Sequence, residues 1–515
     1  MSQAAMKAST ALAGLALGLI LSGCTVGPDF HSPAAPAGAG YEKAGVPAAT
    51  PDSPGQGGGV QQFVQGMDIP GQWWQVFGST QLDTLIKQAM AGNPDLTAAQ
   101  AALREANEQA YAGEGGLFPT IGANVGQNRE RVSGATLGNR NLTEQLSLAT
   151  GALTINYPLD VFGGVRRTVE QLKAQAEYQR FELEATYLTL TSNLVVAVIT
   201  EASLRDQIAA TQDIIRLEQK QLGVLERQFA LGGVAEADVL TQKAALANAQ
   251  ALLPPLSRSL AQQRNQITAL LGRFPNQPPD AQFNLSDLHL PAKLPVSLPS
   301  NLVAQRPDVR AAAATLHAAS AGIGIATANE LPQFTLTGDV GYTAGRFGEM
   351  FTPTSLVYDI AGQAAQTLFD GGALLHKKRA AVAAYDQAAA QYRSTVIKAF
   401  QNVADTLRAL TADADALAAD TAAESASRHS LDVATAQYKL GGVGYLTVLN
   451  AQRSYLDTRI ARVKAEANRY SDTAALFQAL GGGWWHRADI DPADAGSPDR
   501  TWLTTLVRPA AVAQH

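Results

Sequence analysis

Apolar residues recur at every seventh position along two long segments of this chain. In the first segment, residues 165–231, six of seven such positions are apolar or aromatic, and no proline interrupts them. These positions are Tyr187, Leu194, Glu201, Ile208, Ile215, Leu222 and Phe229. The same register recurs 209 positions later, from Val396 to Tyr438, again with six of seven apolar or aromatic. A seam of this period predicts two long helices that pack at shallow angles against neighbouring helices.

Two pairs of shorter segments have the period of strands. Residues 334–342 alternate apolar with polar or small side chains, and residues 356–368 do so more loosely. The matching pair earlier in the chain is 120–128 and 146–157. Segments of about ten residues with one apolar face are typical of a lipid-embedded barrel, while any single pair would also suit a soluble hairpin. Four strands are too few to close a barrel, so a membrane barrel would need several chains.

Landmark residues recur in order at an offset of just over two hundred positions. Pro94 and Pro119 recur as Pro307 and Pro332, both 213 positions later. Three later landmarks recur at 208 or 209 positions: Gly163-Gly164 at Gly371-Gly372, Gly232-Gly233 at Gly441-Gly442, and Leu271-Gly272 at Leu480-Gly481. This order predicts a tandem duplication. Each copy is expected to hold a short helix, two strands, a very long helix, a glycine-centred turn and another short helix.

Proline and glycine set the remaining boundaries. The short helices of the first copy are expected at 82–116 and 236–272. Pro254-Pro255 must kink or break the second of these, because each ring blocks helical hydrogen bonding. Residues 25–70 are rich in proline and glycine, which predicts a mostly irregular tether.

The N-terminus has the order of a secretory signal. Lys7 is followed by the apolar run Ala11 to Leu21 and by the small residues Ser22 and Gly23. The sequence up to Cys24 resembles a bacterial lipobox, in which cleavage leaves the cysteine as a lipidated N-terminus. The alternative is a signal that is cut elsewhere. Thr25 stands where aspartate would signal retention in the inner membrane, which favours the outer membrane.

Composition and motifs exclude several functions. The 515 residues carry a net charge of −6, which disfavours a nucleic-acid binder. Only 16% are charged, and the single cysteine excludes an intramolecular disulfide. No HExxH, GxSxG, Walker A or Rossmann pattern occurs, and the seven histidines lack metal-ligand spacing. We therefore expect no enzyme activity, no cofactor and no metal.

Several motifs together resemble one known family. They are Cys24 to Phe30, Trp73-Trp74, Arg306 to Val309, Phe369 to Gly372, Gly441 to Val443 and Val448 to Arg453. They are similar to the outer membrane factors of bacterial efflux pumps, nearest to the NodT-type lipoproteins and more distantly to TolC. The resemblance covers residues 24–485. It implies a mainly α fold with membrane β: a homotrimer with a 12-stranded outer-membrane β-barrel, continued by a 12-helix periplasmic α-barrel.

The resemblance also implies the functional sites and partners. Cys24 would be lipidated, and the turns would dock a periplasmic adaptor through Gly232, Gly233, Val234, Gly441, Gly442 and Val443. The periplasmic gate would comprise Phe229, Asp238, Tyr438, Thr447 and Asn450. Relatives often carry carboxylates at the positions of Thr447 and Asn450, and here both are neutral. The implied function is a passive exit duct, which receives drugs or other small toxic compounds through the adaptor from an inner-membrane pump.

We expect six segments from these observations: a signal peptide at 1–23, a tether and equatorial segment at 24–81, a first repeat at 82–272, an equatorial linker at 273–300, a second repeat at 301–481, and a C-terminal equatorial segment and tail at 482–515. Outer-membrane lipids would surround the barrel. The alternative function is a periplasmic structural coiled-coil lipoprotein without channel activity. The duplicated strand pair discriminates between them, because only the duct requires it.

Overall fold

A computed structural model describes residues 25–34, 36, 40–43, 45–133 and 143–487. The expected signal peptide, the lipidation site Cys24 and the tail beyond residue 487 lie outside the described residues. The chain divides into two compact units. One holds the described parts of Met1–Pro33, Leu103–Gln179 and Ala312–Tyr392, and the other those of Ala34–Ala102, Arg180–Ala311 and Arg393–His515.

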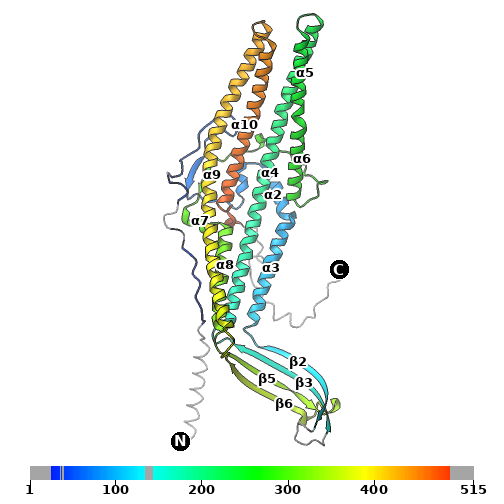
Figure 1. Cartoon of the computed structure of the whole chain (residues 1–515), viewed down its shortest axis with the longest axis vertical. Coiled ribbons are helices and arrows are strands. Elements are labelled where there is room, and N and C mark those ends of the chain that lie inside the picture. The colour runs from blue at the N-terminus through cyan, green and yellow to red at the C-terminus, as the bar shows by residue number, and fades with distance from the viewer. Residues whose placement is uncertain (1–24, 35, 37–39, 44, 134–142, 488–515) are drawn as a thin grey trace. The chain divides into compact units, whose positions relative to one another are not determined.

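The first unit contains a four-stranded antiparallel sheet (Figure 1). Its strands are β2 (Thr120–Ser133), β3 (Thr143–Leu159), β5 (Gln333–Ala344) and β6 (Leu356–Ala365), in the order β2-β3-β5-β6. All four expected strands are therefore present. Both strands of the first pair are longer than expected, because β2 and β3 continue to the pairing of Ser133 with Thr143.

The strand register gives this sheet two unlike faces. Ile121, Ile155, Gly338 and Ile360 stand opposite one another, as do Ala123, Leu153, Val340 and Tyr358. Residues directly opposite share a face, so one face is apolar across all four strands. The other face carries the row Gly122, Thr154, Asp339 and Asp359. Apolar side chains are exposed, with Ile121 at 70% and Ile360 at 77%.

Each strand pair leads into a long helix that begins at an aspartate cap. Helix α4 (Gly164–Ala230) follows β3, and Asp160 accepts hydrogen bonds from the backbone amides of Val165 and Arg166 at 2.8 and 3.0 Å. Helix α9 (Ala373–Lys439) follows β6. Asp370 accepts bonds from the first amides of α9, and these bonds hold the pKa of its carboxyl below the usual value. Both helices have 67 residues and begin 209 positions apart.

The helices after the turns also match in extent. Helices α5 (Glu236–Ala251) and α6 (Leu253–Leu270) together cover the same length as the single helix α10 (Tyr445–Ala479). The break between α5 and α6 falls at Leu252, just before Pro254-Pro255, as expected. Figure 1 shows α4 turning back into α5 and α9 turning back into α10, so that each pair forms a helical hairpin.

The expected single helix at 82–116 is wrong. The structure has α2 (Thr80–Gly92) and α3 (Pro94–Gly115), separated by Asn93. Asn93 is extended because a residue before proline avoids the helical conformation. Its side-chain oxygen accepts bonds from the amides of Asp95 and Leu96, and its Nδ2 donates to the carbonyl of Leu270 at 3.0 Å.

The second copy has the same break with different chemistry. Arg306 separates α7 (Pro299–Gln305) from α8 (Pro307–Ala328). Its Nη1 donates to the carbonyl of Ala479 at 2.9 Å, while its Nε and Nη2 bind the carboxylate of Asp308. Ala479 ends α10 as Leu270 ends α6. The Arg306-Pro307-Asp308 motif is thus a helix break that also caps the returning helix.

Most positions of the heptad seam are buried, whereas Ile208, Leu222, Phe229, Glu424 and Tyr438 are half-buried or exposed. Leu194, Val403 and Leu410 have no exposed surface. Glu201, the exception in the first seam, is buried and paired with Arg205 and Arg264, both at 2.9 Å. Glu424, the exception in the second seam, forms an ion pair with Arg462. Both seam carboxylates are therefore neutralised by arginine.

The tether is mostly irregular, as expected, with one short strand. Strand β1 (Gln62–Gln65) pairs in parallel with β4 (Lys293–Val296). Arg469 of α10, fully buried, donates to the carbonyls of Gly57 and Gly59 and to the hydroxyl of Thr50. Arg469 therefore holds residues 50–59 of the tether against α10.

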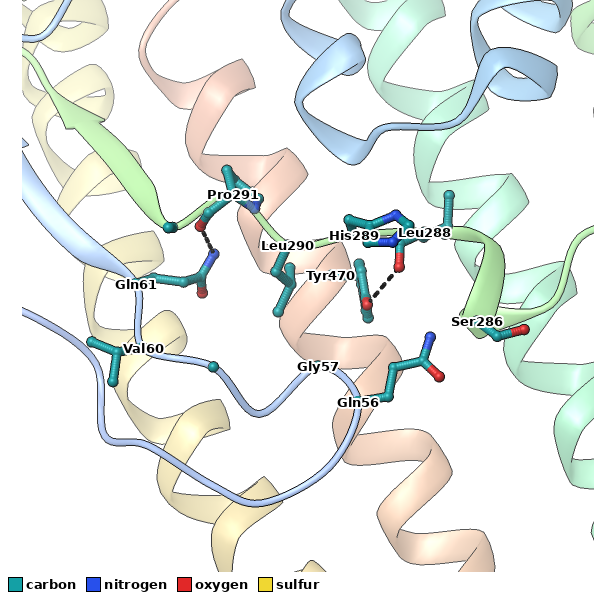
Figure 2. A pocket seen from close by; sticks show the side chains of 12 residues that line it. Gln56, Gly57, Val60, Gln61, Ser286, Leu288, His289, Leu290, Pro291 and Tyr470 are labelled. Carbon is teal, nitrogen blue, oxygen red and sulfur yellow. Dashed lines mark hydrogen bonds between the residues drawn. The ribbon is translucent and has the colours of Figure 1, made fainter.

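A cavity of about 380 Å³ lies beside this fastening (Figure 2). Two hydrogen bonds border it: Gln61 donates to the carbonyl of Pro291 at 3.3 Å, and Tyr470 donates to that of Leu288 at 3.0 Å.

Among the described residues, α4 and α8 each contain a stretch long and apolar enough to cross a membrane. Since 67% of that stretch in α4 is buried, it has the character of a core helix.

Candidate functional site: the hairpin tips

Both hairpins reverse through the same hydrogen-bonded turn. After α4, Gly232 has a left-handed φ of 74°, and the amide of Gly233 donates to the carbonyl of Gln228 at 2.8 Å. After α9, Gly441 has the same φ of 74°, and the amide of Gly442 donates to the carbonyl of Gln437 at 2.8 Å. This is the Schellman termination of a helix, in which glycine supplies the left-handed residue.

The second glycine of each turn does not need to be glycine. Gly233 and Gly442 are not among the residues with positive φ. A Cβ on Gly233 would lie 3.4 Å from the carbonyl oxygen of Gln228, an ordinary contact. Side chains can therefore be introduced at Gly233 and Gly442 without strain in the backbone.

The tips present apolar side chains to solvent. Leu231 and Leu440 precede the glycines and are 87% and 86% exposed. Val234 and Val443 follow the glycines and are half-buried. A leucine this exposed contributes nothing to the packing of its own chain, so each tip carries an apolar contact surface.

An apolar cluster just below the tips joins the two hairpins. Its members come from α4, α5, α9 and α10. The buried residues are Leu225, Val239, Leu431, Ala434, Tyr445, Val448, Leu449 and Ala451. Val234 and Tyr438 pack against them. The rings of Tyr438 and Tyr445 meet edge to face with their centroids 5.3 Å apart.

Two of the expected gate residues contribute to this region. Tyr438 is half-buried, and its hydroxyl donates to the side-chain oxygen of Gln228 at 3.5 Å. Burial raises the pKa of Tyr438, and the negative charge of Asp238 adds to this effect. Asp238 lies in the first turn of α5 and is half-buried. The aromatic ring of Tyr438 thus lies where the two hairpins meet.

The other three gate residues lie apart from the cluster in this chain. Phe229 is 44% exposed and is not part of the apolar cluster. Thr447 and Asn450 are exposed on α10, next to the buried Val448 and Leu449. Their assignment to a gate remains a prediction.

Sequence reasoning missed a polar contact inside the cluster. The hydroxyl of Tyr445 donates to the side-chain oxygen of Gln242 at 2.5 Å, and Gln242 Nε2 donates to the backbone carbonyl of Glu218 at 2.8 Å. A comparison of the two copies could have drawn attention to Tyr445 and Glu218, because the residue type differs between the copies at both positions. Tyr445 stands where the first copy has Glu236, and Glu218 stands where the second copy has Ser427.

The described residues contain no group of three or more His, Cys, Asp or Glu side chains that could hold a metal ion. Exposed apolar tips above a buried cluster that joins two hairpins make this site a contact and packing surface.

An exposed apolar sheet face and long helical hairpins in one chain define a membrane protein with an extensive helical part. The sequence profile of the outer membrane efflux protein family matches residues 85–273 and 298–482. The chain belongs to this family, and its function is efflux through the outer membrane.

Curated relatives match over most of their length. The pyoverdine export outer membrane protein OpmQ of Pseudomonas putida is 29% identical over 423 residues, which cover 81% of this chain and 89% of the relative. The probable efflux pump outer membrane protein TtgC of Pseudomonas putida is 28% identical over 471 residues, covering 91% and 94%. These are efflux proteins, which favours the duct over a structural coiled-coil lipoprotein.

The fold matches that of a solved channel. The outer-membrane channel OprN superposes with a TM-score of 0.80 at 26% identity, over 90% of this chain and 100% of that chain. This chain thus has the mostly helical fold of an outer-membrane channel.

Proposed function

We propose that this protein is the outer-membrane exit duct of a tripartite efflux system. It passively conducts drugs or other small toxic compounds from a periplasmic adaptor and an inner-membrane pump to the outside. The observation that carries the proposal is the four-stranded sheet, which has one exposed apolar face and one polar face. This is the pattern of a barrel wall between lipid and water.

The edges of the sheet support a homotrimer. Strands β2 and β6 each pair with one strand in the described chain, so each leaves one edge open. A bilayer offers no hydrogen bonds to an open edge, and four strands cannot close alone. Three copies would supply twelve strands and join every β2 to a neighbouring β6. We infer a tandem duplication from the equal lengths and offsets of α4 and α9.

The helices would continue the duct into the periplasm. Each chain supplies two hairpins, and in a trimer these would form a 12-helix barrel. Six tips per trimer would dock the adaptor through Gly232, Gly233, Val234, Gly441, Gly442 and Val443. The exposed Leu231 and Leu440 at the same turns support a contact role. We propose that Phe229, Asp238, Tyr438, Thr447 and Asn450 form the gate.

We also propose the segments described above, from the signal peptide at 1–23 to the tail within 482–515, with lipidation of Cys24 as the membrane anchor. Outer-membrane lipids would contact the apolar face of the barrel. Energy would come from the inner-membrane pump, and the partner pump would select the substrate.

Substitution of one residue on each face of β6 tests this proposal. Ile360 lies on the apolar face, while Gln363 lies on the opposite face of the same strand. We expect Ile360→Lys to reduce assembly in the outer membrane, because a lysine facing lipid costs about 2–4 kcal/mol at mid-depth. Gln363→Lys is the matched control and should assemble normally, since it would face water in the duct.

The measurements are outer-membrane fractionation, heat-modifiable trimer migration on a gel, and drug resistance in an efflux-deficient strain. Equal loss of trimer in both variants would contradict a lipid-facing apolar face. A wild-type protein that fractionates with the soluble periplasm would refute the duct altogether.

A further inference from the structure

One buried side chain connects the two hairpins of this chain. Gln242 of α5 has no exposed surface. Its oxygen accepts the hydroxyl hydrogen of Tyr445, from the second hairpin, at 2.5 Å. Its Nε2 donates to the backbone carbonyl of Glu218, on α4 of the first hairpin, at 2.8 Å. Any movement that separates the hairpins at this level must break the bond between Gln242 and Tyr445.

Glu218, whose backbone carbonyl binds Gln242, has one buried carboxyl oxygen without a partner. Glu218 is 6% exposed, and its Oε2 forms no hydrogen bond with the described residues. Burial disfavours the charged form of a carboxyl group, because water no longer solvates it. Burial accordingly raises the pKa of Glu218 to about 7.

The second copy shows that a carboxyl group is not required by the packing. Its matching position is Ser427, which is 8% exposed. The Ser427 hydroxyl donates to the carbonyl of Glu424 at 3.0 Å and bonds to the hydroxyl of Thr458 at 2.6 Å. A small neutral residue with satisfied hydrogen bonds therefore suffices there, whereas the first hairpin buries an ionisable one.

The charged groups around the link do not neutralise Glu218. The groups that act electrostatically on Tyr445 are Glu218 from α4, Asp238 from α5 and Tyr438 from α9, and none is a cation. Lys243, the cation next to Gln242, pairs instead with Glu226 at 3.1 Å, where both side chains are about half exposed. Ionised Glu218 would thus be a buried negative charge without a counter-ion among these groups.

We propose that Glu218 and Gln242 form a proton-responsive link between the two hairpins. Neutral Glu218 permits the close packing that brings Gln242 to Tyr445, and ionised Glu218 loosens it. The inference rests on the proposed function, in which the hairpin tips close and open the duct. It adds Glu218, which lies 24 positions before Gln242, as the residue that controls how readily the two hairpins separate.

The sign follows from proton affinity. Closely packed hairpins bind the Glu218 proton more tightly than separated ones, where the group would titrate near its ordinary value. Acid therefore stabilises the packed arrangement, and the stabilisation is lost as the pH rises from about 4.5 through 7. Between pH 5.5 and 7.5 the equilibrium between packed and separated hairpins should shift about twentyfold.

Hydrogen exchange of the purified full-length protein at pH 5.5 and 7.5 tests the link directly. Amides of α5 and of the first half of α10 are followed, and rates are corrected for the pH dependence of chemical exchange. We expect wild-type opening to be about twentyfold more frequent at pH 7.5. Glu218→Gln and Glu218→Ser, the latter copying the second hairpin, should open rarely at both pH values.

Two further variants complete the design. Glu236→Gln changes an exposed carboxylate at the same tip and should keep the wild-type pH dependence. Tyr445→Phe removes only the hydroxyl and should raise opening at pH 5.5. A Glu218→Gln variant with unchanged pH dependence would overturn the proposal.

Conductance of the same proteins in planar bilayers separates this inference from the proposed function. If the protein conducts ions but its hydrogen exchange does not depend on pH, the proton-responsive link is wrong and the duct is not contradicted. Exchange that follows pH in a protein without conductance would contradict the duct and leave the link standing.

Discussion

At the scale of single residues, the two glycines of each tip have different roles. Gly232 and Gly441 adopt a backbone conformation that strains other residues, while Gly233 and Gly442 do not. The Gly-Gly motif in the sequence does not show which of the two glycines adopts the left-handed conformation. Substitutions at the second glycine can therefore probe adaptor docking with little effect on the hairpin itself.

We expect Gly232→Ala to destabilise the first tip by about 1 kcal/mol, because alanine in the left-handed region costs about 1–2 kcal/mol. Gly233→Ala is the matched control and should leave the tip intact, since its Cβ meets only an ordinary contact. Hydrogen exchange of the amides around the turn measures the difference. Equal exchange in the two variants would contradict the assignment of the strained position to Gly232.

Bulkier residues at the second glycine address function. Gly233→Trp and Gly442→Trp should lower drug resistance while trimer yield stays normal, because the added ring projects from the proposed docking surface. Resistance equal to wild type in both variants would place adaptor docking elsewhere.

At the scale of elements, helix ends are held by residues from distant helices. Asn93 both caps α3 and holds the end of α6, and Arg306 holds the end of α10 in the same way. A break in one helix thus provides the polar groups that complete another. The break at Asn93 between α2 and α3 thus has a structural use, because it frees the polar groups that hold the end of α6.

Asn93→Ala should lower the free energy of local opening at the Asp95 and Leu96 amides by about 1 kcal/mol, because both lose their acceptor. Asn93→Asp keeps an acceptor for α3 but loses the donor to Leu270, so it should protect those amides while loosening the end of α6. Hydrogen exchange of the two peptides separates the effects. Unchanged exchange at Asp95 and Leu96 in the alanine variant would contradict the capping role.

At the scale of the whole molecule, the proposed trimer contains three copies of each residue, so that one substitution changes three symmetry-related positions. Asn450 is exposed on α10 and is neutral. If the tips surround the gate, Asn450→Asp places three negative charges at a narrow aqueous constriction. Such a ring attracts cations and repels anions.

We therefore expect Asn450→Asp to raise cation preference in planar-bilayer recordings and to increase sensitivity to divalent block. Asn450→Gln, which adds no charge, should behave as wild type. The reversal potential in a salt gradient is the measurement. An unchanged reversal potential in the aspartate variant would show that residue 450 does not line the constriction.

Local patterns determined most of the elements of this protein. The segment 165–231 with its seven-residue period predicted α4 to within one residue at each end, and the recurrence of that period from Val396 to Tyr438 predicted a second long helix, α9. The offset of 209 also relates the start of α5 to the start of α10 and the end of α6 to the end of α10. The alternation in 334–342 predicted β5. Such patterns are readable because a helix or strand repeats its contacts at a fixed spacing, so neighbouring residues carry the signal.

Only the tertiary structure decided which distant residues meet. Val64 pairs with Pro295, Arg469 holds the carbonyls of Gly57 and Gly59, and Gln242 meets Tyr445 across 203 positions. None of these contacts repeats along the chain, so no period reveals it. The burial that alters the proton affinity of Glu218 has the same origin, because desolvation depends on what packs around a group rather than on its neighbours in sequence.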